Sequence, residues 1–218
     1  MNRLSRTRTA SLDVDPQKGF TPLCPDELPV EDGHKIFLEL NQNHLFSHVN
    51  AVSKDAHSRN ANWIATDENP QFSKIKGNNL DVRWKSHCNV GEEGFELIDG
   101  LQMVQNYDFV VYKGLEKDMH PYGACYHDFR EKISTGLIEF FRSKGVENVI
   151  VGGLALDYCV KTTVIQLLNA GFVVLINLAS TKSIKSFNDV VEEYKKMGEY
   201  NKTLFLARDS HDLQKYFV

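Results

Sequence analysis

Hydrophobic and polar residues follow one another along the chain in blocks that predict strands separated by helices. Short apolar or β-branched runs, typical of buried strands, lie at residues 9–14, 48–54, 109–113, 148–153, 172–178 and 203–207. Longer stretches with apolar residues at helical spacing lie at residues 34–46, 135–144, 157–170 and 188–197. Gly145 and Gly171 stand at two expected helix ends, and Asn188 is expected to cap the last helix.

This alternation predicts the fold class. Strands that alternate with helices of about ten or more residues form a parallel sheet with helices on both faces. We therefore expect one α/β domain over residues 1–218, built as three α/β/α layers around a mainly parallel sheet. Residues 1–8 carry three arginines and no apolar core, so we expect a flexible leader rather than an export signal.

One long segment lacks this patterning. Residues 58–108 show little periodicity and contain Trp63, Trp84 and His87. A stretch of this length without regular structure inside a compact domain is usually functional. We therefore expect this segment to contribute to a binding site.

Composition narrows the range of partners. The 29 acidic and 25 basic residues give a formal charge of -4, and no basic run could neutralise a phosphate backbone, so nucleic acid is not expected. The apolar runs are far shorter than the roughly 20 residues of a membrane helix. The four cysteines are widely spaced without a CxxC pair, which indicates a reducing, cytoplasmic location.

Reactive residues follow four of the predicted strands. Ligands of open α/β sheets bind beyond the carboxyl ends of the strands. The residues at these ends are Asp15, the pair Asp55 and His57, Lys113 and Cys159. A helix N-terminus and a nearby lysine both favour a thiolate, so Cys159 is a candidate nucleophile, and the Asp15 carboxylate could carry a proton for it.

Each of these residues also has an ordinary interpretation. A cysteine at such a turn is more often a small buried side chain, Asp15 alone would be a turn or capping residue, and a DxH pair occurs by chance. The pair Asp55 and His57 would nevertheless point to one side of an extended strand end. Oxygen and nitrogen ligands suit zinc, iron or manganese, and His87 could be the third ligand.

Four separate motifs resemble the nicotinamidases of the isochorismatase-like cysteine hydrolase superfamily over nearly the whole chain. They are a DxQxxF pattern at Asp15, Gln17 and Phe20, a DxH motif at Asp55 and His57, the sequence VVYKG around Lys113, and GGLALDYCV around Cys159. The resemblance implies a catalytic triad of Asp15, Lys113 and Cys159. It also implies metal ligands at Asp55, His57 and His87.

The same resemblance assigns the substrate pocket. Phe20 and Trp84 match the aromatic walls around a pyridine ring, where stacking on a flat ligand is favourable. The backbone amides of Ala155 and Cys159 match the oxyanion hole, next to a cis peptide expected between Leu154 and Ala155.

The chain departs from the family pattern in its metal motif. Many members carry a second histidine a few residues after the DxH, and residues 58–63 contain none. This leaves three protein ligands, with water or another group completing the shell. The loop after Lys113 matches the family only at Lys113 and Gly114. His120 and His127 could line the pocket from this loop, although such histidines are more often surface or core residues than ligands.

The function that the resemblance implies is hydrolysis of nicotinamide, and of pyrazinamide as a further substrate, to the acid and ammonia through a Cys159 thioester. Such an enzyme acts in NAD salvage and uses one divalent ion, with zinc expected first and manganese or iron as alternatives. The alternatives are another amide or carbamoyl hydrolase of the superfamily and a non-catalytic small-molecule binding protein. The metal motif favours nicotinamide, since relatives closer to isochorismatase lack it. A homo-oligomer stays an alternative to a monomer.

Overall fold

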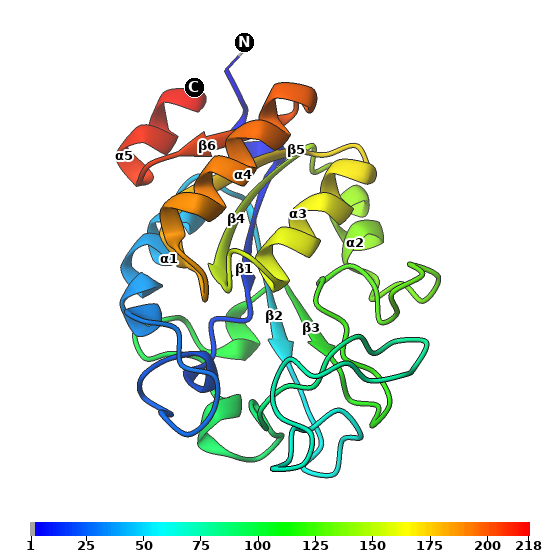
Figure 1. Cartoon of the computed structure of the whole chain (residues 1–218). Coiled ribbons are helices and arrows are strands. Elements are labelled where there is room, and N and C mark those ends of the chain that lie inside the picture. Colours follow the sequence, from blue (N-terminus) through cyan, green and yellow to red (C-terminus); the bar gives the residue numbers. More distant parts are fainter. Residues whose placement is uncertain (1–2) are drawn as a thin grey trace.

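A single parallel sheet forms the centre of the molecule. The computed structural model describes residues 3–218, and its sheet has the strand order β3-β2-β1-β4-β5-β6 (Figure 1). The strands are β1 Thr9–Val14, β2 Val49–Asp55, β3 Phe109–Lys113, β4 Asn148–Leu154, β5 Val173–Lys182 and β6 Leu204–Ala207. Every neighbouring pair is parallel, which confirms the predicted sheet.

Helices cover both faces of this sheet. They are α1 Phe37–His44, α2 Leu137–Ser143, α3 Cys159–Asn169, α4 Phe187–Tyr200 and α5 Ser210–Leu213. The main core joins the sheet to α2, α3 and α4, whereas α1 and α5 pack on the opposite face (Figure 1). The three-layer prediction is therefore confirmed. No helix in residues 3–218 is long and apolar enough to cross a bilayer.

Local bounds differ from the predicted ones in several places. The helix expected at residues 34–46 is divided into a 3₁₀ turn, Gly33–Ile36, and the shorter α1. The cap prediction for Asn188 is wrong, because α4 begins at Phe187 and Ser186 occupies the N-cap position. Serine and asparagine are about equally favourable at the N-cap, and Phe187, which packs against the core, is the first residue of the helix. The four-residue α5 is too short to give a periodic signal.

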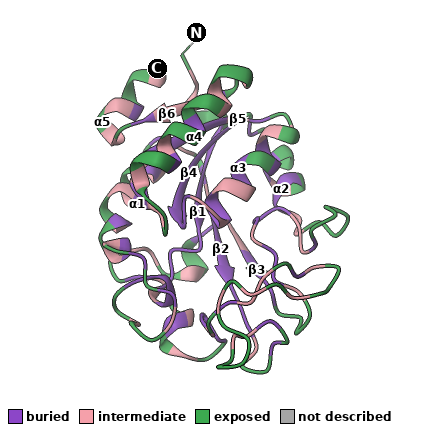
Figure 2. Ribbon diagram, viewed as in Figure 1, coloured by how far each residue is buried: buried purple, intermediate pink, exposed green. Residues whose placement is uncertain are grey.

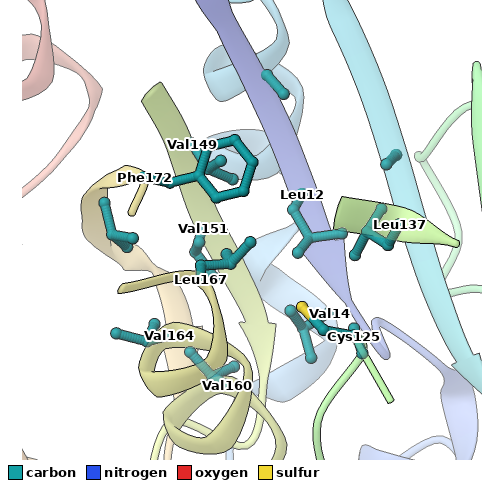
Figure 3. Close-up of a cluster of buried hydrophobic side chains, with 14 of the residues drawn as sticks. Leu12, Val14, Cys125, Leu137, Val149, Val151, Val160, Val164, Leu167 and Phe172 are labelled. Atoms are coloured by element: carbon teal, nitrogen blue, oxygen red, sulfur yellow. The ribbon is translucent and has the colours of Figure 1, made fainter. Parts of the chain in front are cut away.

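The core lies between the central strands and α3. Leu12, Val14 and Val151 point toward the apolar side of this helix, as Figure 3 shows. On the facing side of the helix lie Val160 and Val164, which are fully buried. Each such side chain contributes roughly 1.5–3 kcal/mol through its removal from water. This packing holds the first turn of α3, where Cys159 lies, against the ends of β1 and β4.

Alternate residues of β1 face the other side and include a buried polar contact. Asp13 Oδ2 accepts hydrogen bonds from His44 Nε2 at 2.9 Å and from the Tyr107 hydroxyl at 2.7 Å. His44 ends α1, and Tyr107 lies just before β3. The contact therefore anchors the end of the long unpatterned segment to the sheet.

The two ends of the described chain lie together. Leu4 donates its backbone N–H to the Tyr216 carbonyl at 2.7 Å and pairs with Phe217. The described part of the expected leader, residues 3–8, is thus bound to the C-terminal segment near its start. Both ends lie opposite the loops that follow the strands (Figure 1).

The segment between β2 and β3 gathers beyond the carboxyl ends of these strands. All of residues 56–108 are described, and their only helical turns are the 3₁₀ turns Glu93–Phe95 and Val104–Asn106. This confirms the lack of regular structure. The central strands β1, β2 and β4 are almost wholly buried, whereas β3, predicted as a buried strand, is the outermost one and only partly buried. The segment between β2 and β3 mixes buried and exposed residues (Figure 2). Two of its buried members, Trp84 and His87, line the pocket of the site.

Candidate active site and metal centre

The ends of neighbouring strands bring the predicted reactive residues together. Asp15 follows β1, Asp55 and Lys113 are the last residues of β2 and β3, and Cys159 is the first residue of α3 after β4. The β2–β3 register places Asp55 directly opposite Lys113. The strand order reverses between β1 and β4, which is where open α/β sheets bind their ligands.

Asp15 is held in an unusual backbone conformation. Its φ is 46°, in the left-handed region where few residues other than glycine occur. Ser53 fixes it twice: its hydroxyl donates to Asp15 Oδ1 at 2.7 Å, and its carbonyl accepts the Asp15 N–H at 3.0 Å. Such outliers persist where the surrounding contacts determine them, and they cluster at functional sites.

Gly153 lets β4 approach β1 closely enough for this site to form. Its φ is 117°, and a Cβ at this position would lie 1.9 Å from the Val14 carbonyl oxygen. No larger residue fits without separating the two strands. The glycine pair in GGLALDYCV thus has a packing role at the base of the site.

Lys113 is the electrostatic centre of the site. Its fully buried ammonium lies 2.9 Å from Asp15 Oδ2, forms an ion pair with Asp55, and donates to Cys159 Sγ at 3.8 Å. Burial alone would lower the pKa of Lys113, but the two carboxylates raise it well above its usual value. In return, and against the effect of burial, Lys113 holds the pKa of Asp55 well below its usual value.

The protonation of the thiol differs from the prediction. Burial raises the pKa of Cys159 well above its usual value against the charge of Lys113, which lowers it, and the charges of Asp15 and Asp55 raise it further. The expectation that Lys113 holds a resting thiolate is therefore wrong, because removal of the thiol from water has a larger effect on its pKa than the Lys113 charge. Burial also raises the pKa of Asp15 to about 6. Asp15 is thus a base suited to taking the thiol proton near neutral pH.

The turn before α3 has the features predicted for an oxyanion hole. The peptide between Leu154 and Ala155 is cis, as the family resemblance predicted. The Ala155 carbonyl accepts the N–H groups of Tyr158 and Val160 at 3.0 and 3.1 Å. Within residues 3–218, the amides of Ala155 and Cys159 donate to no protein acceptor, so both remain available to a ligand.

Two of the predicted metal ligands are oriented by backbone carbonyls. His57 Nδ1 donates to the Gly114 carbonyl at 3.0 Å, and His87 Nδ1 donates to the Lys85 carbonyl at 2.7 Å. Each Nε2 therefore carries a free lone pair, and these atoms lie 3.4 and 3.8 Å from Asp55 Oδ2. Histidines that ligate metals are oriented in this way by partners on the other ring nitrogen. The three residues thus fit a divalent ion.

A third histidine, His120, joins this group. His57, His87 and His120 offer ligand atoms that all lie within 4.8 Å of one another. His120 is 3% exposed, and neither of its ring nitrogens has a hydrogen-bond partner in the described chain. The prediction that His120 could line the pocket is confirmed, whereas His127 is not among the lining residues. The sequence did not indicate His120 as a ligand, because the loop after Lys113 has no periodicity from which its direction could be read.

Aromatic rings enclose the three histidines. Trp63 packs its ring against all of them, with centroid distances of 4.7 Å to His57, 5.3 Å to His87 and 4.4 Å to His120. This role of Trp63 was missed, since the residue lies in the unpatterned segment. The two residues predicted as aromatic walls lie beside these rings: Phe20 is 5.2 Å from His87, and Trp84 stacks on His120 at 5.9 Å.

Gln17 has a supporting role that its place in the DxQxxF pattern did not reveal. Its Oε1 accepts the Asp55 N–H at 2.7 Å, and its Nε2 donates to the Asp55 carbonyl at 2.8 Å. The side chain thereby acts as one more strand partner for Asp55 and fixes the point at which β2 presents its carboxylate.

One pocket opens onto both the thiol and two of the three histidines. The residues that line it include Phe20, Asp55, Trp84, His87, His120, Ala155, Tyr158 and Cys159. The free volume is about 20 Å³, enough for little more than a water molecule. The Trp84 wall is fixed from outside, since its Nε1 donates to the Tyr122 hydroxyl at 3.0 Å, which in turn donates to Asp81 at 2.8 Å.

A parallel α/β domain with a cysteine, an aspartate and a lysine at its switch point is the arrangement expected of the isochorismatase-like cysteine hydrolases. The family model described as the isochorismatase domain matches residues 9–186, so the chain belongs to this family.

Named relatives narrow the comparison. A nicotinamidase of Acinetobacter baylyi is 28% identical over 178 residues, which cover 80% of this chain and 81% of the relative. A solved nicotinamidase and pyrazinamidase of Acinetobacter baumanii is 25% identical, with a TM-score of 0.82 over 95% of this chain and 98% of its own. A pyrazinamidase of Pyrococcus horikoshii, solved in complex with zinc, shares the fold at 24% identity, with a TM-score of 0.70 over 92% of this chain and 98% of its own.

Proposed function

We propose that the chain is a metal-dependent amidase that hydrolyses nicotinamide to nicotinate and ammonia. The observation that carries this proposal is that the catalytic residues and the candidate metal-ligating histidines lie at one aromatic pocket. The Cys159 thiol lies with carboxylate oxygens of Asp15 and Asp55 in a cluster whose ligand atoms are within 4.8 Å of one another, and His87 and His120 line the same cavity. The relatives from Acinetobacter support the same substrate.

Asp55, His57 and His87 would hold one divalent ion, and His and carboxylate ligands suit zinc first, with manganese or iron as alternatives. The zinc complex of the Pyrococcus relative supports this order. When bound, the ion would act as a Lewis acid toward the pyridine nitrogen of the substrate. Phe20 and Trp84 would flank the ring, which directs its carboxamide toward Cys159.

The first half-reaction forms a thioester. Asp15 accepts the thiol proton, and the sulfur adds to the carboxamide carbon. The amides of Ala155 and Cys159 donate to the resulting oxyanion, a contribution of about 2.7–4 kcal/mol for each such donor in well-studied enzymes. Asp15 then gives its proton to the amide nitrogen, the carbon–nitrogen bond breaks, and ammonia leaves.

The second half-reaction releases the acid. Asp15, again a carboxylate, takes a proton from water as the water adds to the thioester carbon. The same two amides stabilise the second oxyanion, the carbon–sulfur bond breaks, and the proton returns to the sulfur. Lys113 lies between Asp15 and Cys159 throughout, so its charge stabilises whichever of them is negative.

The direct test is ammonia release from nicotinamide by purified protein, after chelation and after return of zinc, manganese or iron. Activity should disappear on chelation and return with one of these ions. The variant Cys159→Ala should lose activity by at least about a thousandfold while it keeps its fold. Cys24→Ala is the matched control, because Cys24 is a free thiol outside the pocket.

Two other outcomes would redirect the assignment. Ammonia release from other carboxamides, and none from nicotinamide, would indicate a different amide hydrolase of the family. A Cys159 inert to thiol reagents, with no amidase activity, would indicate a binding protein.

Pyrazinamide is the second substrate to assay, and the released nicotinate would enter NAD salvage. The four free cysteines support the proposed cytoplasmic location, and a homo-oligomer stays a prediction for mass measurement.

A further inference from the structure

We propose that His120 is a fourth protein ligand of the divalent ion, in the place of the histidine that the segment after the DxH motif lacks. The inference rests on the metal site of the proposed function and adds a ligand from a different part of the chain. The donor would come from the loop after Lys113, seven residues beyond that lysine. Four ligands, one carboxylate and three imidazoles, would then surround the ion.

The spacing of the three rings supports a shared ion. An imidazole bound at about 2.0–2.1 Å places its ring centre roughly 3 Å from the ion, so rings at tetrahedral angles have centres roughly 5 Å apart. The observed distances are 4.8 Å between His57 and His87, 5.0 Å between His57 and His120, and 5.5 Å between His87 and His120. His120 thus occupies the same kind of position as the two motif histidines.

The hydrogen bonding of His120 also indicates a missing partner. Buried polar atoms in proteins are almost always satisfied, and leaving one unpaired is unfavourable. In residues 3–218, both ring nitrogens of His120 and Nε2 of His57 are buried without a partner. His57 and His120 belong, with His87, to one cluster in which each residue offers one ligand atom, so a single ion would satisfy a nitrogen of each ring.

The surrounding chain holds His120 in this position. Its backbone N–H donates to the Asn79 carbonyl at 3.0 Å, and its ring packs between Trp63 and Trp84. The next residue, Pro121, gives its carbonyl to Lys113 Nζ at 3.3 Å. The loop is therefore tied to the site on both sides of the histidine, which limits the freedom of the ring to turn away.

A ligand role and a packing role can be separated by two substitutions. His120→Phe keeps an aromatic ring between the tryptophans and removes the ligand atoms, whereas His120→Ala removes both. His127→Phe and His127→Ala are the matched controls, since His127 lies in the same loop and outside the cluster. The probe is zinc alone, measured by competition with a chromophoric chelator, together with the visible absorption spectrum of the cobalt-substituted protein.

Both His120 variants should bind zinc at least about tenfold to a hundredfold more weakly. Substitution of a residue that only hydrogen-bonds to a metal ligand already causes a loss of this size. Their cobalt spectra should change in band position and intensity, because the number of nitrogen ligands falls. Added imidazole should restore part of the zinc affinity of His120→Ala by filling the vacated space. The His127 variants should match the unmodified protein in both measurements.

Wild-type zinc affinity and an unchanged cobalt spectrum in His120→Phe would overturn the proposal. If that variant also raised KM for nicotinamide, His120 would contact the substrate instead. Failure of the proposed function is a separate result: the unmodified protein would release no ammonia from nicotinamide, yet zinc affinity would still depend on His120. Hydrolysis of nicotinamide with zinc affinity independent of His120 would refute this inference alone.

Discussion

Gly114 gives His57 both its hydrogen-bond acceptor and the space for its ring. The Gly114 carbonyl accepts from His57 Nδ1 at 3.0 Å, and a Cβ on Gly114 would lie 2.4 Å from His57 Cε1. The residue also has a φ of +72°, which disfavours any side chain. The glycine after the buried lysine is therefore part of the metal site through its contact with His57.

This relationship predicts a specific effect of Gly114→Ala. The new methyl group should displace His57, so zinc affinity and nicotinamide hydrolysis should both fall by at least about tenfold. The left-handed backbone adds a stability cost of about 1–3 kcal/mol. Zinc competition and urea unfolding measure the two effects separately.

Gly145→Ala is the control for backbone strain. Gly145 has a similar φ of +69°, and a Cβ there meets nothing within 4 Å. This variant should lose stability to a comparable degree and keep its zinc affinity. Equal losses of zinc affinity in the two variants would contradict the role given to Gly114.

Gln17→Leu tests how firmly Asp55 must be held. The substitution removes both hydrogen bonds to the Asp55 backbone at nearly constant volume, so the carboxylate should become less well placed for the ion and for Lys113. Zinc affinity should fall about tenfold to a hundredfold. The exposed Gln105, changed to Leu, is the control and should have no effect. Unchanged affinity in Gln17→Leu would show that the β2–β3 register alone positions Asp55.

The pKa of Asp15 predicts the acid limit of activity. Below its pKa of about 6, Asp15 is protonated and cannot accept the thiol proton. The value of kcat/KM should therefore fall about tenfold for each pH unit below 6 and level off above it. Initial rates between about pH 4.5 and 8 would show this limb, with circular dichroism to confirm the fold.

Asp15→Asn provides the comparison for that profile. It should lower kcat/KM by about a hundredfold to ten-thousandfold, the usual contribution of general acid–base catalysis. Its residual activity should lack the limb near pH 6. If the limb persisted at the same pH, its titrating group would be a residue other than Asp15.

The core prediction concerns α3, which carries Cys159. Leu167→Ala should reduce the free energy of unfolding by about 2–5 kcal/mol, because Leu167 is fully buried against the central strands. Leu38→Ala, on the exposed side of α1 at 63% exposure, should change it by no more than about 0.5 kcal/mol. Urea midpoints at constant slope measure both. Similar small changes would mean that α3 does not depend on this packing.

Sequence patterning was sufficient for the sheet and for the residues at its strand ends. Buried strands such as β4 are continuous apolar runs, and a residue just after the end of a strand, such as Asp15 after β1, must lie at the carboxyl end of the sheet. The same reasoning failed for Asn188, because Ser186 is an equally suitable N-cap residue and α4 begins directly after it. It allowed His120 a place lining the pocket but could not indicate it as a ligand, and it gave Trp63 no role, because both lie in segments without a period.

The sequence by itself determined the parallel α/β fold and the meeting of Asp15, Asp55, Lys113 and Cys159, because both follow from local periodicity and from the common direction of parallel strands. Only the tertiary structure decided which loop residues complete the metal site and which group holds the thiol proton. Loop directions depend on distant contacts such as that of His120 with Asn79. The pKa of Cys159 depends on burial and on how two carboxylates share one lysine charge, which are properties of the folded site alone.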